Sequence, residues 1–315
     1  MQQDQHHHTH PHEHHHHALP MTADGRLSTV FYWAIALNLI YVVIEASAGW
    51  VKGSMGLLSD AGHNLGDVAS LLISLVAYKA ARRAANDRYT FGYGRATVEA
   101  SLANAVILYV AVVLIAVESI DRLLHPSAVD GDTVAWVAAA GVVVNGVTAW
   151  MLLGHSRNDL NVRGAFMHMA ADTLVSVGVV VSGIIIAFTG WYVIDPIIGL
   201  CIAVMIAAGS YSLLRESLRM ALDGVPDNID VDKVRAAILA VPEVSSMHHL
   251  HIWSMSTTST ALTVHVVVSD PSQIDRAIAG VREAACGCGI SHSTIEAETA
   301  SNECGDVSCS CGQKR

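Results

Sequence analysis

The sequence predicts an α-helical membrane protein with six membrane-spanning helices, followed by a small α+β domain in the order αββαβ. Of the 315 residues, 52% are hydrophobic and only 15% are charged, whereas soluble domains carry about 25% charged residues. Apolar runs of about 20 residues, long enough to cross a bilayer, recur through the first two thirds of the chain. After Leu222 the pattern changes to short amphipathic helices and strands rich in β-branched residues.

The composition divides the chain into four parts: a His-rich tail (1–27), a membrane domain (28–220), a small cytosolic domain (221–300) and a Cys-rich tail (301–315). The His-rich tail is interpreted as a loose metal collector, because closely spaced imidazoles bind borderline cations. An inert solvated tail and an expression tag are the alternatives. The interspersed Thr9, Pro11 and Glu13 argue against a tag.

The six predicted spans follow one another through short connections. Several polar side chains lie inside them, including Asn38 and Glu45 in the first span, Asn104 in the third and Asn145 in the fourth. The second span carries a polar stripe at helical spacing that ends at Asp67. The predicted spans are 28–50, 56–78, 97–120, 134–153, 165–188 and 193–214.

The distribution of Lys and Arg predicts the orientation. The loops after the second and fourth spans carry more cations than the loops after the first, third and fifth. Cations favour the cytoplasmic side, so these two loops and both termini are expected in the cytoplasm, in a multi-pass protein of the cell inner (plasma) membrane. The scattered cations form no nucleic-acid footprint, and membrane lipid is the expected surrounding.

Two four-residue steps, His63 to Asp67 and His168 to Asp172, are the central motif. Residues four apart share one face of a helix, and ionisable residues inside a membrane mark function by default. At 1.5 Å per residue, Asp67 and Asp172 lie roughly 15 and 20 Å below the outer boundary. Four side chains at similar depth therefore predict one shared site for a divalent cation.

Two imidazoles and two carboxylates favour Zn²⁺, with Cd²⁺, Co²⁺, Ni²⁺ and Fe²⁺ as alternatives. Metal binding requires deprotonated ligands, so the site is expected to exchange H⁺ for metal, which predicts proton-coupled transport. Simple interhelical hydrogen bonding is one alternative, and a metal sensor or store without transport is another. An intramembrane metalloprotease is a third, but the His12–His16 match to HExxH lies in a His/Pro tail that supplies no helix.

The small domain is predicted from helices at 231–241 and 274–285 and strands at 244–254, 261–269 and 291–299. These strands carry a second group of metal-ligating side chains, interpreted as a regulatory or dimer-linked cation site, with a His-rich solvated surface as the alternative. Strict alternation puts His249 and His251 on one strand face and His248 on the other. The predicted ligands are His248, His249, His251, His265, Glu296 and Glu298.

Five of the six cysteines follow residue 285. With a cytosolic C-terminus, disulfides are disfavoured and thiolate metal ligation becomes possible. Cys286, Cys288, Cys304, Cys309 and Cys311 are interpreted either as one soft thiolate site or as reduced thiols without a metal.

Several motifs resemble the cation diffusion facilitator family of metal/proton antiporters, in its bacterial zinc-type branch. The match extends over roughly residues 28–300. It is carried by LLSDAGHNLGD (57–67), YTFGYGRATVEA (89–100), DLNVRGAFMHMAAD (159–172), WYVIDPIIGL (191–200), ALDGVP (221–226) and HHLHIWS (248–254).

The resemblance implies a homodimer that exports Zn²⁺ against entering H⁺ by alternating access, and a ferredoxin-like cytosolic domain. It implies a transporter rather than an enzyme, with zinc as the substrate and as a regulatory ligand and with no other cofactor. His63, Asp67, His168 and Asp172 match the family's transport-site positions. His248, His265, Glu296 and Glu298 fall near its cytosolic metal positions, and His249 stands where the family usually has Asp.

Overall fold

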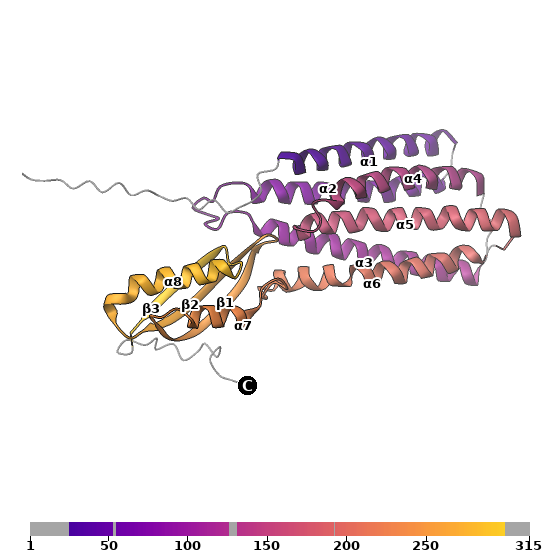
Figure 1. The fold of residues 1–315 in the computed structure, drawn as a ribbon. Coiled ribbons are helices and arrows are strands. Elements are labelled where there is room, and N and C mark those ends of the chain that lie inside the picture. Colours follow the sequence, from indigo (N-terminus) through magenta and orange to yellow (C-terminus); the bar gives the residue numbers. More distant parts are fainter. Residues whose placement is uncertain (1–24, 53–54, 126–130, 192, 300–315) are drawn as a thin grey trace, which may run out of the picture.

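The computed structural model describes residues 25–52, 55–125, 131–191 and 193–299. Within these residues the chain forms a bundle of long helices with a small α/β domain at one end (Figure 1). The long helices fall on the six predicted spans, so the predicted helix positions are confirmed. They are α1 (Gly25–Lys52), α2 (Met55–Ala81), α3 (Arg95–Leu124), α4 (Gly131–Leu153), α5 (Leu160–Thr189) and α6 (Ile194–Ala221).

Within the described residues, four helices are long and apolar enough to cross a membrane: Arg26–Ala48, Arg95–Leu124, Leu160–Ile186 and Pro196–Ala221. The described part of α4 contributes a shorter apolar helix, Ala139–Leu153. Large apolar side chains such as Val113, Leu114 and Val117 on α3 are exposed on the bundle, as expected for helices that face lipid. The helical part is therefore a multi-pass membrane domain.

The ends of α5 are set by local sequence. Asp159 is its N-cap, and its side chain accepts a hydrogen bond from the backbone N–H of Asn161, which satisfies one of the donors that a helix start leaves open. Gly190 ends the helix in the left-handed region, with φ of 65°, a conformation that glycine adopts without steric cost. The helix that carries His168 and Asp172 thus starts and stops at fixed residues.

The small domain has the predicted order. It contains α7 (Val231–Leu239), β1 (Val244–Ser256), β2 (Ser259–Val268), a short 3₁₀ turn η1 (Pro271–Gln273), α8 (Ile274–Gly287) and β3 (His292–Glu298). The sheet has the strand order β1-β2-β3. β1 and β2 pair antiparallel, and β2 and β3 pair parallel.

One face of this sheet forms the domain's hydrophobic core. Leu262, Val264 and Val266 of β2 are buried in a cluster with Ile238 of α7 and Val281 of α8. Since alternate residues of a strand face opposite sides, His265 lies on the face turned away from this core.

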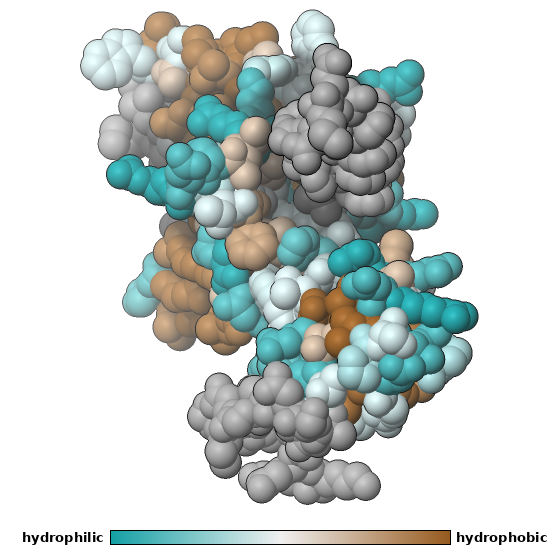
Figure 2. Space-filling view, turned by 90° about the vertical axis from the view of Figure 1, so that its left-hand side faces the viewer, coloured by the Kyte–Doolittle hydropathy of each residue, from teal (hydrophilic) through white to brown (hydrophobic). Residues whose placement is uncertain are grey.

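Figure 2 views the molecule from the small-domain end. Hydrophilic side chains cover much of the small domain, and hydrophobic side chains flank the helical part. This contrast matches one domain in water and one in lipid. The predicted tails lie almost wholly outside the described residues, so the interpretations of the His-rich tail and of Cys304, Cys309 and Cys311 remain predictions.

Candidate metal centre

α2 and α5 bring three of the predicted transport-site residues together. The Nε2 atom of His168 lies 3.0 Å from Oδ1 of Asp67 and 3.7 Å from Oδ2 of Asp172. Ligand atoms of the three side chains all lie within 4.8 Å of one another. The two helices therefore face each other at this level, as a shared site requires.

The three side chains are withdrawn from solvent. Their exposed fractions are 1% for Asp67, 2% for His168 and 8% for Asp172. Burying a carboxylate costs much free energy unless it is paired or binds a metal. Two carboxylates around one imidazole therefore form a strongly favourable environment for a divalent cation or for protons.

The donor set fits a transition-metal ion. Imidazole nitrogen and carboxylate oxygen are common Zn²⁺ ligands, and three such groups leave room for a fourth. His63 lies on α2 one turn before Asp67, but its side chain is outside the part of the chain that the structure describes. Its role as the fourth ligand stays a prediction.

The sequence did not single out Glu45 of α1 as part of a cluster. Its carboxylate is buried and accepts a hydrogen bond of 2.7 Å from Asn64 Nδ2 and one of 3.4 Å from the Tyr41 hydroxyl. Asn64 precedes Asp67 by one turn of α2. In the sequence, the four-residue spacing of Tyr41 and Glu45 was the only sign that these two side chains meet on one face of α1. The hydrogen bond from Asn64 to Glu45 joins α1 to α2, the helix that carries Asp67.

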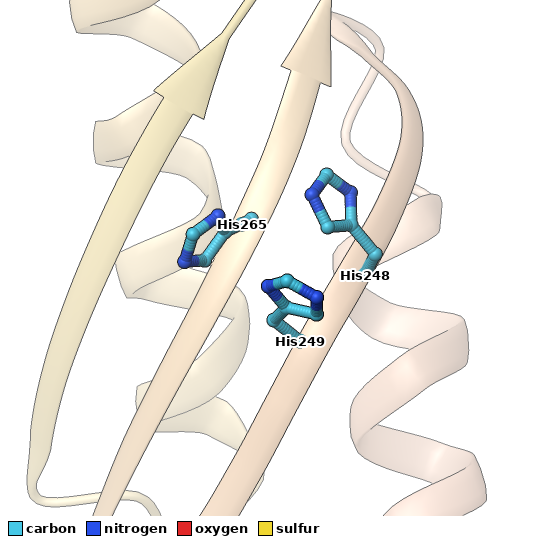
Figure 3. Close-up of side chains that lie close together, drawn as sticks. All are labelled: His248, His249 and His265. Carbon is cyan, nitrogen blue, oxygen red and sulfur yellow. The ribbon is translucent and has the colours of Figure 1, made fainter. Parts of the chain in front are cut away.

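The small domain holds a second cluster, on the sheet face away from its core. The rings of His248, His249 and His265 lie with centroids 4.8–5.2 Å apart and point toward the space between β1 and β2 (Figure 3). His265 Nδ1 is 2.6 Å from Glu298 Oε1, and its Nε2 is 3.5 Å from Glu296 Oε2. This group is compact enough to hold a cation.

A β-bulge creates this arrangement. The pairing shifts between His248, opposite His265, and His251, opposite Thr263, so β1 has one extra residue there. His249 takes up the irregularity with φ of 51°, in the left-handed region that non-glycine residues rarely adopt. The prediction that His249 and His251 share one strand face was therefore wrong, because the ring of His249 lies against that of His248.

His251 is not part of this cluster among the described residues. Its side chain is exposed and lines a cavity of about 540 Å³ at the junction of the two domains, with Arg95, Asp223 and Trp253. The cavity lies beside the ion pair of Arg95 and Asp223. The structure thus separates His251 from the other predicted ligands.

The turn between β1 and β2 touches the membrane domain at the starts of α3 and α5. The backbone N–H of Thr257 donates to Thr97 Oγ1 at 3.1 Å, and the Thr257 hydroxyl donates to Asp159 Oδ1 at 2.7 Å. Asp159 therefore serves both as the N-cap of α5 and as the acceptor for the small domain. Burial raises the pKa of Asp159 above its ordinary value, although hydrogen bonds from Thr257 and the backbone of Asn161 oppose the rise.

This double role predicts different outcomes for two substitutions. Asp159→Ala removes the cap and the bond to Thr257, and we expect it to lower stability by about 1–2 kcal/mol, seen as a lower Tm of the purified protein in detergent. Asp159→Asn keeps an acceptor oxygen and is expected to retain most of this stability.

The pH dependence provides the control. A folded-state pKa above the ordinary value means that the folded protein binds more protons between the two values, so stability falls as pH rises through this window. The Asp159→Asn variant lacks this titration and should show a flatter profile. If the wild type and the Asp159→Asn variant showed the same dependence of stability on pH, the assigned environment of Asp159 would be contradicted.

Taken together, the fold and the buried cluster define a multi-pass membrane protein with an imidazole–carboxylate centre among its helices. The sequence matches the model of the cation efflux transmembrane domain over residues 31–221 and that of the cation efflux protein cytoplasmic domain over residues 226–286. The chain therefore belongs to the cation efflux family, the cation diffusion facilitators that its motifs resemble. This is a family of transporters, not enzymes.

Relatives from several bacteria are similar along most of their length. The cadmium, cobalt and zinc/H(+)-K(+) antiporter of Bacillus velezensis is 36% identical over 267 residues, which cover 83% of this chain and 85% of the relative. The zinc transporter ZitB of Escherichia coli is 34% identical over 269 residues, covering 84% and 86%. The metal cation efflux system protein CzcD of Cupriavidus metallidurans is 38% identical over 234 residues, covering 74% of each chain.

Proposed function

We propose that this protein exports Zn²⁺ from the cytoplasm in exchange for H⁺, by alternating access in a homodimer. The single observation that carries the proposal is the buried contact of His168 with both Asp67 and Asp172. The relatives support the same class of cargo, since their names specify zinc, cadmium or cobalt, and the Bacillus relative is named an antiporter. Cd²⁺ and Co²⁺ are the nearest alternative cargoes.

The chemistry of the cluster couples the two ions. A cation binds only when the carboxylates are ionised and the imidazole is neutral. Protons that reach the site from outside neutralise Asp67 or Asp172, or charge His168, and the cation then leaves on that side. When those protons pass to the cytoplasm, the site regains its affinity for metal.

The proposed topology places all six long helices across the inner membrane, with both termini and the small, ferredoxin-like domain in the cytoplasm. The excess of Lys and Arg in the loops after α2 and α4 supports this orientation. The small domain then faces the compartment from which the metal is taken. The homodimer is the assembly that the family resemblance implies.

We further propose that the cluster of His248, His249, His265, Glu296 and Glu298 binds a regulatory zinc ion. His265 is central, because it contacts both the other histidines and Glu298. We expect His265→Ala to lower the number of zinc ions bound per full-length chain, measured by equilibrium dialysis, while proton-driven transport persists.

His251→Ala is the matched control for this experiment, since His251 lies on the same strand but outside the cluster. Its zinc stoichiometry should equal that of the wild type. Equal stoichiometry in the His265→Ala and wild-type proteins would contradict the second site.

Flux through proteoliposomes tests the transport proposal. With the zinc concentration equal on both sides, an imposed pH gradient should drive zinc toward the more acidic side, because protons leave that side in exchange. Reversing the gradient should reverse the flux. A sensor or store would take up zinc without regard to the gradient. Deleting residues 1–25 should leave the flux intact, which separates the transport site from the HExxH match in that tail.

A further inference from the structure

A layer of buried polar side chains separates the metal centre from the small-domain end of the bundle. From Asp67, α2 continues through Ser70 and Ser74 toward that end. From His168, α5 runs back through Gly164 and Asn161 to Asp159, where Thr257 of the small domain docks. The exposed fractions of Ser70, Ser74, Asn104 and Asn161 are all 0%.

Asn104 of α3 holds this layer together. Its Oδ1 accepts a hydrogen bond of 3.0 Å from Ser70 Oγ, and its Nδ2 donates one of 2.7 Å to Ser74 Oγ. A Cβ atom built on Gly164 of α5 would lie 3.2 Å from the Cβ of Asn104. Asn104 therefore fills the space between α2 and α5 directly beside the layer of Asp67 and His168.

Two further contacts extend the layer toward the small domain. Asn161 Nδ2 donates to the Ser74 carbonyl oxygen at 3.0 Å, and Ser101 Oγ of α3 lies 2.7 Å from Ser217 Oγ of α6. No described residue donates to Asn161 Oδ1, although this oxygen is buried. Because buried polar atoms generally have a partner, this oxygen is available to accept a hydrogen bond from a water molecule.

We propose that Ser70, Ser74, Asn104 and Asn161, here called the polar seal, close the metal centre from the small-domain side in this conformation. The same groups line the route by which a partly hydrated divalent cation reaches Asp67 once α3 separates from α2 and α5. This inference rests on the transport function proposed above. It assigns Asn104 as a positioning residue of the access route, not as a metal ligand.

The polar composition of the seal allows the access route both to close and to open. Leu or Ile side chains would close the space more firmly, but they would offer nothing to a hydrated ion after opening. Hydroxyl and amide groups bond one another when the route is closed and bond water when it is open, so the net free energy of each exchange is small. The alternative is that these polar groups permanently fasten the helices together.

A reversible cross-link distinguishes a seal that opens from a permanent contact. The distance of 3.2 Å between the Cβ of Asn104 and a Cβ built on Gly164 is close to the Cβ–Cβ distance of about 3.5–4.5 Å found in disulfides. In a full-length chain whose six native cysteines are replaced by serine, we expect oxidation of the Asn104→Cys, Gly164→Cys pair to lower proton-driven zinc flux at least about tenfold. Reduction should restore it.

The control pair joins α5 to α4 instead. A Cβ on Gly146 would lie 3.6 Å from Cγ2 of Thr173, and oxidation of Gly146→Cys, Thr173→Cys should leave the flux within about twofold of its reduced value. The proposal of a polar seal would be overturned if the oxidised Asn104→Cys, Gly164→Cys variant kept full zinc flux. It would also be overturned if oxidation lowered zinc flux equally in both double-cysteine variants.

A second measurement needs no transport and therefore remains informative if the double variant is inactive when reduced. In Asn104→Ala, an impermeant chelator added on the small-domain side should remove zinc from the metal centre about tenfold faster than from wild type, since two hydrogen bonds of the seal are lost. Chelator on the opposite side should act at the wild-type rate. Unchanged rates on both sides would overturn the seal, whereas absence of proton-driven flux in the wild type would refute only the transport proposal.

Discussion

Asp172→Ala is expected to reduce zinc transport by at least about a hundredfold, since losing one ligand of a buried metal site commonly costs several kcal/mol of binding free energy. Asp172 is buried beside His168, four residues earlier on α5, and the substitution leaves Asp67 and His168 without the second carboxylate. Zinc uptake into proteoliposomes under a fixed pH gradient measures the effect.

Folding provides the control for this loss. The alanine keeps the helical backbone, and we expect the variant to insert into the membrane and to elute like wild type in size-exclusion chromatography. Ser182→Ala, at another buried polar position of α5, serves as a matched variant that should transport normally. Near-normal transport by the Asp172→Ala protein would count heavily against the metal centre.

His168→Asp is expected to change which cation is transported. His168 is the one imidazole that the described residues contribute to the centre, and replacing it leaves carboxylates in that part of the site. Carboxylate ligands favour harder cations such as Mn²⁺ over Zn²⁺. We therefore expect zinc flux to fall about tenfold or more while Mn²⁺ flux rises relative to zinc.

Competition between the two metals checks this prediction in one assay. In wild type, excess Mn²⁺ should barely inhibit zinc flux, and in His168→Asp it should inhibit strongly. An unchanged preference for zinc would show that His168 does not contribute to selectivity, and the imidazole would then act through hydrogen bonding to Asp67 alone.

The sequence predicted the elements well because their signals are local. Apolar length and periodicity placed the six long helices and the order of the small domain. The four-residue steps put His168 and Asp172 on one helix face, and the comparison of depths brought Asp67 to the same level. Each of these inferences needs only helix geometry and the thickness of a bilayer.

What the sequence did not reveal depends on contacts between distant elements. The bulge at His249 breaks the alternation on which the strand faces were predicted, and no glycine marks it in the sequence. The docking of Thr257 on Asp159 joins residues 98 positions apart. Likewise, Asn104 was recognised as a polar residue in a span, but its bonds to Ser70 and Ser74 required the relative placement of α2 and α3.

The most direct test of the central claim counts the protons released when zinc binds the helical bundle. Titration calorimetry is done on a His265→Ala protein that lacks the His-rich residues 1–25. Repeating it in buffers of different ionisation enthalpy separates this centre from the tail and from the cluster of the small domain. We predict that zinc binding releases protons and that both binding and release are lost when Asp67→Asn and Asp172→Asn are introduced together. Zinc binding of unchanged affinity and proton release in that variant would contradict a shared metal and proton site between α2 and α5.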